Sequence, residues 1–406
     1  MGDLKGGADA ATKAGGGLRG VPGSIWALGF VSLLMDVSSE MIHALLPVYL
    51  VTGLGASMLT VGVIEGIAVA TASVAKVFSG ALSDWFGRRK LLAVIGYGLA
   101  AATKPIFPLA QSIDWLVAAR FIDRIGKGIR GAPRDALIAD IAPPDLRGAS
   151  FGLRQSLDMA GGFLGPLLAI VLMGLTANHF ITVFWIAVIP AFLCVAVLLI
   201  FVKEPERPQT ERKVRMPLRR AELGRLGARY WWVVILAAAF SLARFSEAFL
   251  ILRAESLGLS LMWVPGVLML MALAYSLSAY PVGVLSDRMD RITLLIVALL
   301  LLIAANLVLA FSAGIVPLAL GVILWGLHMG FSQGLLATLI AETAPAELRG
   351  TAFGMFNLVT GLALLVASVI AGILWDTVGP QATFLAGAAF SALAIIGLVA
   401  RRRLAT

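Results

Sequence analysis

The stretch Leu137-Ile-Ala-Asp-Ile-Ala-Pro-Pro-Asp-Leu-Arg-Gly-Ala-Ser-Phe-Gly152 occurs a second time, as Leu339-Ile-Ala-Glu-Thr-Ala-Pro-Ala-Glu-Leu-Arg-Gly-Thr-Ala-Phe-Gly354. The two copies are offset by 202 residues (339 minus 137). A shorter match, offset by 203 residues (283 minus 80), relates residues 80–84 to residues 283–287. Two matches at nearly the same offset predict an internal repeat, in which each half of the chain forms the same structural unit.

The rest of the chain is strongly apolar. Hydrophobic residues make up 60% of it and charged residues 14%, and the mean hydropathy is +0.94. Soluble domains have about 25% charged residues, so this composition predicts an integral membrane protein. The single Cys194 excludes an intramolecular disulfide and a cysteine metal site.

Apolar runs of about 20 residues, the length that crosses a bilayer, predict twelve transmembrane helices. They cover residues 25–51, 57–82, 90–110, 112–140, 149–176, 179–202, 229–253, 262–286, 292–312, 315–341, 349–375 and 380–400. The expected fold is therefore an all-α membrane protein with two six-helix pseudo-repeats. Because both repeats run in the same direction, an axis along the membrane normal should relate them, with a site between them.

Changes in polarity divide the chain into five segments. We expect a disordered cytoplasmic tail at 1–22, a six-helix bundle at 23–202, a basic cytoplasmic linker at 203–228, a second bundle at 229–400 and a cytoplasmic tail at 401–406. Lys and Arg gather in the linker and in loops on the same side of the path, which places both termini in the cytoplasm of a bacterial-type inner membrane. The net charge of +9 is then explained by topology, and no basic soluble face exists to bind nucleic acid.

The stretch Gly80-Ala-Leu-Ser-Asp-Trp-Phe-Gly-Arg-Arg-Lys90 follows the second expected helix. It resembles the signature loop of the major facilitator superfamily, and the resemblance extends over residues 25–400. In that family the loop is a conformational latch. The resemblance implies this role for Gly80, Asp84, Gly87, Arg88, Asp287 and Arg291. The alternative is that the basic residues are positive-inside anchors.

Two other stretches resemble motifs of the same family. Arg120-Phe-Ile-Asp-Arg-Ile-Gly126 is similar to the motif of helix 4, which implies that Arg120 takes part in proton transfer. Gly161-Gly-Phe-Leu-Gly-Pro166 resembles the helix 5 motif of the antiporter branches, which implies efflux. The alternative for Gly161, Gly165 and Pro166 is structural, since glycines four apart allow close helix packing and proline permits a bend.

Asp36, Glu40 and His43 lie on one face of the first expected helix, at positions i, i+4 and i+7. A carboxylate at membrane depth costs at least about 2.5 kcal/mol, so it is usually paired, hydrated or protonated. We therefore expect Asp36 or Glu40 to carry a coupling proton; the alternative is structural pairing with arginines of the fourth helix. No Cys or second His lies near His43, so metal binding is not expected.

The fourth expected helix has one charged face and one apolar face. In so apolar a chain the charged face must line a water-filled cavity or pair across it. The candidate substrate-binding residues on this and other helices are His43, Arg124, Lys127, Arg130, Arg154, Asp158, Arg244 and Glu247. The charges embedded in the helices, away from their ends, are nine basic and seven acidic residues: Lys76, Lys104, Arg120, Arg124, Lys127, Arg130, Arg134, Arg154 and Arg244 against Asp36, Glu40, Glu65, Asp123, Asp135, Asp158 and Glu247. An anionic substrate group could balance the surplus of two.

The sequence contains no P-loop and no HExxH motif, and a chain expected to be all-α offers no strand-to-helix nucleophile elbow, so we expect neither an enzyme nor a cofactor. The first hypothesis is a monomeric carrier that exports a small organic solute by alternating access, in exchange for a proton on Asp36 or Glu40. The second is proton-coupled uptake of an organic anion, with the basic residues of the fourth helix as the clamp. The third is a membrane sensor or channel with the same architecture.

Overall fold

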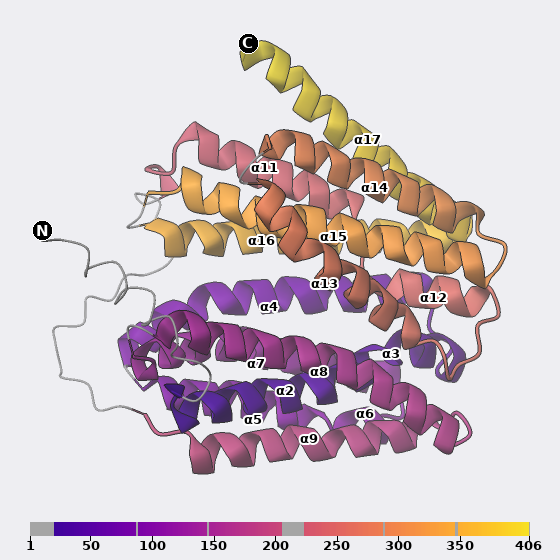
Figure 1. Ribbon diagram of the computed structural model, residues 1–406. Helices are drawn as coiled ribbons and strands as arrows, with labels where there is room; N and C mark the ends of the chain where they lie inside the picture. Colours follow the sequence, from indigo (N-terminus) through magenta and orange to yellow (C-terminus); the bar gives the residue numbers. More distant parts are fainter. Residues whose placement is uncertain are drawn as a thin grey trace, which may run out of the picture.

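The computed structural model describes residues 20–86, 88–143, 146–204, 223–286, 289–345 and 348–405. The first half contains α2 (Gly23–His43), α3 (Leu46–Val48), the π-helix η3 (Tyr49–Gly53), α4 (Met58–Phe86), α5 (Arg89–Thr103), α6 (Ile106–Leu109), α7 (Ile113–Ile141), α8 (Arg147–Leu175) and α9 (Phe180–Phe201). The second half contains α11 (Ala228–Ala243), α12 (Ala248–Ser256), α13 (Gly266–Ser286), α14 (Arg291–Phe311), α15 (Ile315–Thr343), α16 (Arg349–Thr377) and α17 (Pro380–Ala405). In Figure 1 the two halves form separate layers of helices.

Eleven stretches of the described chain are long and apolar enough to cross a membrane. The helix α7 is not among them, although it has 29 residues, because Arg, Lys and Asp recur along it. It packs against α4 and α5, and Arg120, Asp123, Arg124 and Arg130 of its charged face are buried inside the bundle. With α7 as the twelfth helix, the predicted all-α membrane fold of two six-helix halves is confirmed.

Three of the expected helices are interrupted. The run 25–51 breaks after α2, where Pro47 lies in the first turn of α3, and the run 90–110 breaks at Pro105 before α6. Proline has no N–H and its ring clashes with the carbonyl four residues earlier. The run 229–253 breaks at Arg244, whose backbone is extended, and the Ser246 hydroxyl accepts an N–H of α12 at 3.2 Å. Since this third break contains no proline, the sequence offered no cue for it.

The expected termini and linker are only partly described. Residues 1–19 and 205–222 lie outside the described chain. The helix α17 continues to Ala405, five residues beyond the expected helix end at residue 400. At the start of the linker, the Glu204 carboxylate accepts the backbone N–H groups of Arg89 at 2.5 Å and Lys90 at 3.2 Å. The linker is thereby fastened to the first turn of α5, and the division into domains stays a prediction.

The internal repeat extends to side-chain contacts. Arg89 at the start of α5 pairs with Asp140 near the end of α7, with 2.6 Å between Nη1 and Oδ2. The residues 202 positions later, Arg291 and Glu342, form the same pair between α14 and α15. The two halves therefore share an ion pair between their third and fourth helices.

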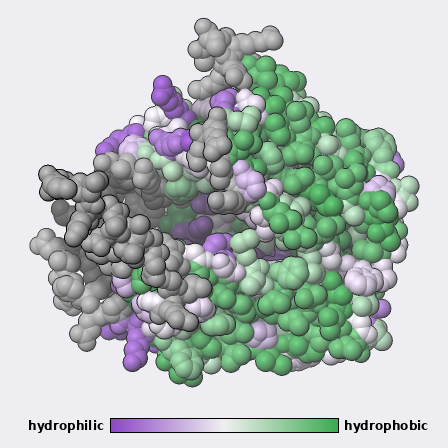
Figure 2. All heavy atoms as spheres, viewed as in Figure 1, coloured by the Kyte–Doolittle hydropathy of each residue, from purple (hydrophilic) through white to green (hydrophobic). Residues whose placement is uncertain are grey.

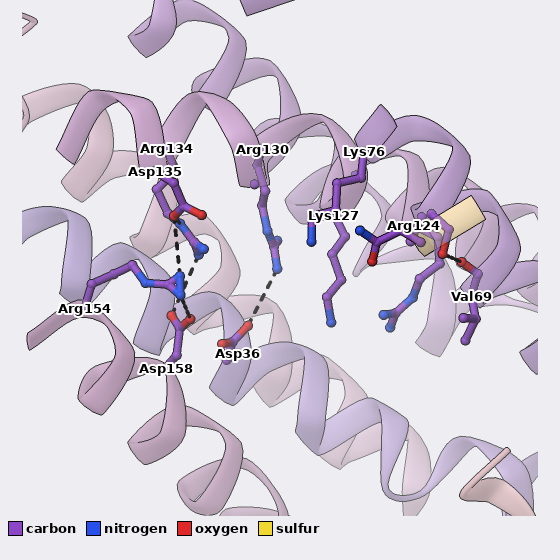
Figure 3. A pocket seen from close by; sticks show the side chains of 15 residues that line it. Asp36, Val69, Lys76, Arg124, Lys127, Arg130, Arg134, Asp135, Arg154 and Asp158 are labelled. Carbon is purple, nitrogen blue, oxygen red and sulfur yellow. Dashed lines mark hydrogen bonds and ion pairs between the residues drawn. The ribbon is translucent and has the colours of Figure 1, made fainter. Parts of the chain in front are cut away.

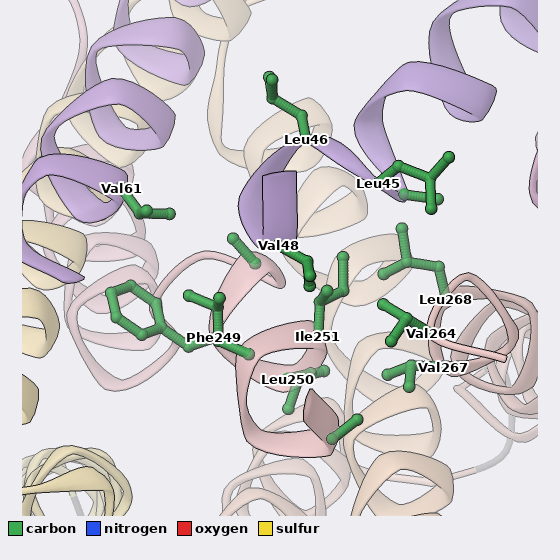
Figure 4. Packing of buried hydrophobic residues seen from close by; sticks show 14 of the residues in the cluster. Leu45, Leu46, Val48, Val61, Phe249, Leu250, Ile251, Val264, Val267 and Leu268 are labelled. Carbon is green, nitrogen blue, oxygen red and sulfur yellow. The ribbon is translucent and has the colours of Figure 1, made fainter. Parts of the chain in front are cut away.

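We call the end of the bundle where Glu204 and Leu223 flank the linker the linker end, and the opposite end the sealed end (left and right in Figure 1). At the sealed end one apolar cluster joins both halves. Leu45, Leu46 and Val48 of the first half and Phe249, Leu250 and Ile251 of the second half belong to this cluster (Figure 4). All six are fully buried, so apolar packing closes this end.

The contact between α4 and α16 reinforces the seal. The Asp376 carboxylate, near the end of α16, accepts the backbone N–H groups of Met58 at 3.0 Å and Leu59 at 2.8 Å. It thus caps the first turn of a helix in the other half. A Cβ on Gly62 would lie 2.2 Å from the carbonyl oxygen of Ser368, so the two backbones touch here.

At the linker end, by contrast, each apolar cluster belongs to a single half. Figure 2 shows hydrophilic residues in a hollow between the two hydrophobic halves, on the linker side. The halves are therefore joined by the apolar cluster at the sealed end and along α4 and α16, where a Cβ on Gly361 would lie 2.6 Å from the Ser73 hydroxyl oxygen. The site lies in the hollow that remains between them on the linker side.

Candidate functional site

A cavity of about 500 Å³ lies between the halves, and we call it the main cavity. This volume is within the range of about 300–1,000 Å³ that small-molecule sites have. Its described walls come from α2, α4, α7 and α8, and among the described lining residues only Asn357 on α16 belongs to the second half. The charged lining residues are Asp36, Lys76, Arg124, Lys127, Arg130, Arg134, Asp135, Arg154 and Asp158 (Figure 3).

Four of these side chains form a compensated network near the linker end. Arg154 pairs with Asp158 at 2.8 Å and with Asp135 at 3.4 Å. Arg134 donates to Asp135 at 3.1 Å and lies 3.8 Å from Asp158. The two cations and two carboxylates of this network balance each other, so it connects α7 to α8 and contributes no net charge to the cavity.

Asp36 is the carboxylate of α2 that reaches the main cavity. Its nearest cation is Arg130, with 3.6 Å between Oδ1 and Nη2, and its side chain is 26% exposed. The Arg130 guanidinium also lies over the Tyr97 ring, 4.7 Å from the centroid, and this stacking positions it. The loose pair and the exposure leave Asp36 accessible to water or a solute in the cavity.

A chain of contacts joins Glu40 to Arg120. The His43 Nδ1 lies 3.3 Å from Glu40, and its Nε2 lies 3.5 Å from Glu65. Glu65 in turn accepts two hydrogen bonds from Nη2 of Arg120, each 3.1 Å long. A neutral imidazole can donate through only one of its nitrogens. One further proton on the imidazole would let His43 donate to both Glu40 and Glu65. This arrangement can therefore take up one proton, shared between His43 and its two carboxylate neighbours.

A buried ion pair lies where the third helix of the first half breaks. Lys104 donates to Asp123 at 2.9 Å and to the Ser39 hydroxyl at 3.1 Å. Arg124 shares the same carboxylate: its Nε lies 3.4 Å from Asp123 without making a hydrogen bond to it. One carboxylate therefore faces two cations, and Arg124 brings the second positive charge to the cavity wall.

Two lysines in the main cavity have no carboxylate of their own. Within the described chain, no acidic side chain lies within ion-pair distance of Lys76 or Lys127. Figure 3 shows both side chains among the lining residues, with no ion pair drawn to either of them. With Arg124, they give the first-half wall a surplus of positive charge.

A second cavity of about 280 Å³ adjoins the main one and is lined by the second half. Its lining includes Arg244, Gln333 and Thr360, and Asn357 lines both cavities. Arg244 makes no ion pair with any acidic group of the described chain. The second wall is thus polar, carries one arginine and has no acidic lining residue.

The structure separates the predicted substrate-binding residues into three groups. Arg124, Lys127, Arg130, Arg154 and Asp158 line the main cavity. Arg244 lines the second cavity. His43 lines neither and lies in the chain from Glu40 to Arg120, and Glu247 lies at the start of α12. Of the residues predicted to couple protons, Asp36 lines the main cavity, and Glu40 and Arg120 are joined through His43 and Glu65. Their roles stay predictions.

Several residues at the site were not among the predicted ones. Lys76, Arg134 and Asp135 line the main cavity, and Glu65 completes the chain to Arg120. All four are charged residues inside apolar helices, which is unusual enough to indicate a functional position, but the sequence alone assigns none of them a role. Asn357 carried no such signal, because an amide in a helix is common.

Most residues of the predicted latch lie outside the described chain or have only their backbone described. Gly87 and Asp287 lie outside the described residues, and only the backbone of Gly80 and Asp84 is described, in the last turns of α4. Arg88 precedes α5. Arg291 begins α14 and pairs with Glu342. The latch therefore stays a prediction.

The glycines of α8 bring this helix onto α2. A Cβ on Gly161 would lie 2.8 Å from the carbonyl oxygen of Leu33, and one on Gly165 would lie 2.7 Å from the Cβ of Glu40. Pro166 lies inside α8. The packing interpretation thus fits the geometry. The contact lies beside Asp36 and Glu40, the two carboxylates of α2. The antiport role stays a prediction.

Comparisons with known proteins agree on a family. The model of the Major Facilitator Superfamily matches residues 28–368 and 267–405. An uncharacterised MFS-type transporter of Methanocaldococcus jannaschii is 32% identical over 381 residues, which is 92% of each chain. The multidrug resistance protein MdtG of Salmonella arizonae is 25% identical over 390 residues, 92% of this chain and 94% of the relative. The solved nucleoside transporter NupG shares the fold, with a TM-score of 0.76 at 15% identity over 93% of this chain and 99% of that one.

Proposed function

The chain belongs to the Major Facilitator Superfamily, and from this premise we propose that it is a secondary active transporter that moves a small organic solute by alternating access. It is a multi-pass membrane protein of a transporter family rather than an enzyme. The observation that carries the proposal is a solute-sized cavity between two repeat-related halves, which apolar packing closes at the sealed end. Such a shape suits a carrier whose halves rock about a central site.

The orientation that we propose follows from the distribution of charge. Both termini and the basic linker lie in the cytoplasm, since Lys and Arg gather in the loops of that side. The linker end then faces the cytoplasm of a bacterial-type inner membrane. In this orientation the described conformation is open inward and closed outward, and the protein acts as a monomer.

We further propose that transport is coupled to protons. Asp36 reaches the cavity with a loose ion-pair partner, and Glu40 begins a chain that can hold one proton. Both carboxylates lie where α8 packs closely on α2, so a change in their charge would act on a helix contact in the first half. Protonation and helix movement would then be linked.

Two directions of transport have support. The MdtG relatives carry a name that refers to multidrug resistance, which favours export in exchange for protons. The surplus of cations on the cavity walls favours an anion instead, and the second candidate is proton-coupled uptake of an organic anion. Deletion of the protein separates them: the cell accumulates the solute if the protein exports it and loses accumulation if the protein imports it.

Alternating access can be tested against a channel by fixing the sealed end. Val48 and Ile251 lie in the apolar cluster between the halves, and α3 contacts α12. In a Cys194→Ser background, Val48→Cys with Ile251→Cys would be joined by a reducible crosslinker in proteoliposomes. We expect crosslinking to stop solute flux and reduction to restore it. Each single cysteine variant, treated in the same way, is the control, and flux that persists through the crosslinked protein would indicate a channel.

A further inference from the structure

We propose that the transported solute is an organic anion with two separated negative groups, one held by Arg124 and Lys127 of the first half and the other by Arg244 of the second. The inference rests on the proposed function and names the substrate class of the same site. It depends on which cations around the two cavities have a carboxylate partner within the protein and which do not.

The cations of α7 differ in whether the protein neutralises them. Arg120 has Glu65, Arg130 has Asp36, and Arg134 has Asp135 and Asp158. By contrast, no acidic side chain of the described chain lies within ion-pair distance of Lys127, and Arg124 shares Asp123 with Lys104. Arg124 is 9% exposed and lines the main cavity.

A charge at membrane depth is expensive unless it is compensated. Arg124 and Lys127 are neighbours on one face of α7, at positions i and i+3, and both line the main cavity. A carboxylate or phosphate group of a solute would supply the missing counter-charge and could bind Arg124 through two parallel hydrogen bonds. The first-half wall is therefore a site for one anionic group.

The second-half wall offers a separate cation. Arg244 lies at the break between α11 and α12, and its extended backbone removes it from the helix just where it lines the second cavity. That cavity has no acidic lining residue. Its other polar groups, Ser241, Gln333 and Thr360, suit hydroxyl or carbonyl groups between the two charges.

The two cavities adjoin at Asn357, which lines both. One solute can therefore extend from the wall of α7 to Arg244. When the linker end closes, the cations of the two walls approach and repel each other. A solute with a negative group at each end would bridge the walls and reverse this repulsion, whereas a solute with one negative group would leave one wall uncompensated. The dianion would thus favour the closed cavity as well as bind in it.

The test uses matched probes that differ only in charge. Succinate, adipate and suberate, their monomethyl esters and their dimethyl esters would be compared by thermal stabilisation of the purified protein in detergent and by counterflow in proteoliposomes. A phosphorylated acid, 3-phosphoglycerate, distinguishes a phosphate group from a carboxylate. We expect one dianion to bind at least tenfold more tightly than its monoester, and the diester not to bind.

Variants then assign each end of the solute. Lys127→Gln and Arg244→Gln should each weaken dianion binding about tenfold or more and make the dianion and its monoester bind alike. Arg229→Gln, an exposed arginine at the linker end, is the control and should bind like wild type. Equal binding of dianion and monoester by wild type would overturn the inference.

The outcomes separate the inference from the proposed function. Transport of neutral or singly charged solutes without any preference for a dianion overturns the inference and leaves the carrier intact. If flux of a bound solute also continues through the crosslinked sealed end described above, the carrier itself is wrong. Full dianion affinity in Arg244→Gln would reassign the second anionic group to the first half and overturn the bridge.

Discussion

The two halves of the molecule share a fold and differ in charge at equivalent places, as α7 and α15 show most clearly. In the first half Lys104 and Asp123 form a buried ion pair. The residues 202 positions later are Asn306 and Trp325, which are also fully buried. The Asn306 Oδ1 and the Trp325 Nε1 have no hydrogen-bond partner within the described chain.

The same offset places Gly326 opposite Arg124 and Met329 opposite Lys127. The helix α15 is therefore apolar enough to count as a membrane span, and α7 is not. The comparison teaches that the repeat preserves helix positions and the ion pair between the third and fourth helices, while the chemistry of the cavity belongs mostly to one half. The second half supplies a largely neutral wall and Arg244.

The largest expected effect comes from breaking the buried pair of the first half. Lys104→Met leaves Asp123 with only Arg124, whose Nε lies 3.4 Å away and makes no hydrogen bond to it. Removal of one partner of a buried pair costs about 3–5 kcal/mol. We expect a clear fall in the thermal unfolding midpoint of the protein in detergent. Lys104→Met combined with Asp123→Leu should recover most of the loss, because the uncompensated carboxylate is gone.

The equivalent change in the second half is the control for this comparison. Asn306→Leu removes one hydrogen bond, to the carbonyl of Leu302 at 3.0 Å, and a typical protein hydrogen bond contributes only about 1 kcal/mol. A loss of stability as large as that of Lys104→Met would contradict the view that charge distinguishes the two halves.

The next effect sharpens the comparison at the fifth helix of each half. Gly165 on α8 has no room for a Cβ beside Glu40, whereas the residue 202 positions later is Ala367. We expect Gly165→Ala to force α8 away from α2 and to lower stability by about 1–3 kcal/mol, the usual cost of overpacking. Circular dichroism during heating would measure it.

Gly162 on the same helix provides the matched control. A Cβ there meets nothing within 4 Å, so Gly162→Ala should leave stability unchanged or raise it slightly through helix propensity. If both variants behave alike, the close contact of α8 with α2 is wrong.

A smaller effect is expected where the halves meet at the sealed end. Asp376→Ala removes a cap that one half provides to the other, and loss of an N-cap costs about 1 kcal/mol. The sealed end should open more often, by about fivefold. A buried reporter, Leu46→Cys in a Cys194→Ser background, would then react faster with a water-soluble maleimide.

Asp290 is the matched cap within one half. It accepts the backbone N–H groups of Ile292 and Thr293 at the start of its own helix, α14. Asp290→Ala should cost similar stability without exposing the reporter. Faster labelling in both variants would mean that general loosening, and not the contact between halves, exposes the sealed end.

Much of this architecture could be predicted from sequence because it depends on local pattern. Apolar runs located the helices, and the charged face of the fourth one indicated that it lines a cavity or pairs across it; the structure shows both, in Lys127 and in Arg120. The break at Arg244 has no proline and depends on Ser246, whose backbone N–H donates to the Ser368 hydroxyl of α16 at 3.1 Å. Such a contact is tertiary and leaves no pattern in the sequence.

Many residues of the site could be predicted from the sequence, but the contacts between them could not. The spacing of Asp36, Glu40 and His43 placed them on one face, but nothing in the sequence joins His43 to Glu65 or Arg130 to Tyr97. Those pairings decide which charges are neutralised within the protein. They also decide which cations are left for a solute, and this is why substrate class required the structure.

Solute-driven proton movement in proteoliposomes tests most directly whether the first half alone carries the coupling. Asp36→Asn and Glu40→Gln would be compared with Glu247→Gln, which removes a carboxylate of the second half, under an imposed pH gradient. The account predicts that the two first-half variants bind solute and no longer move protons with it, while Glu247→Gln keeps the wild-type ratio of protons to solute. An unchanged ratio in both first-half variants, or its loss in Glu247→Gln, would contradict the account.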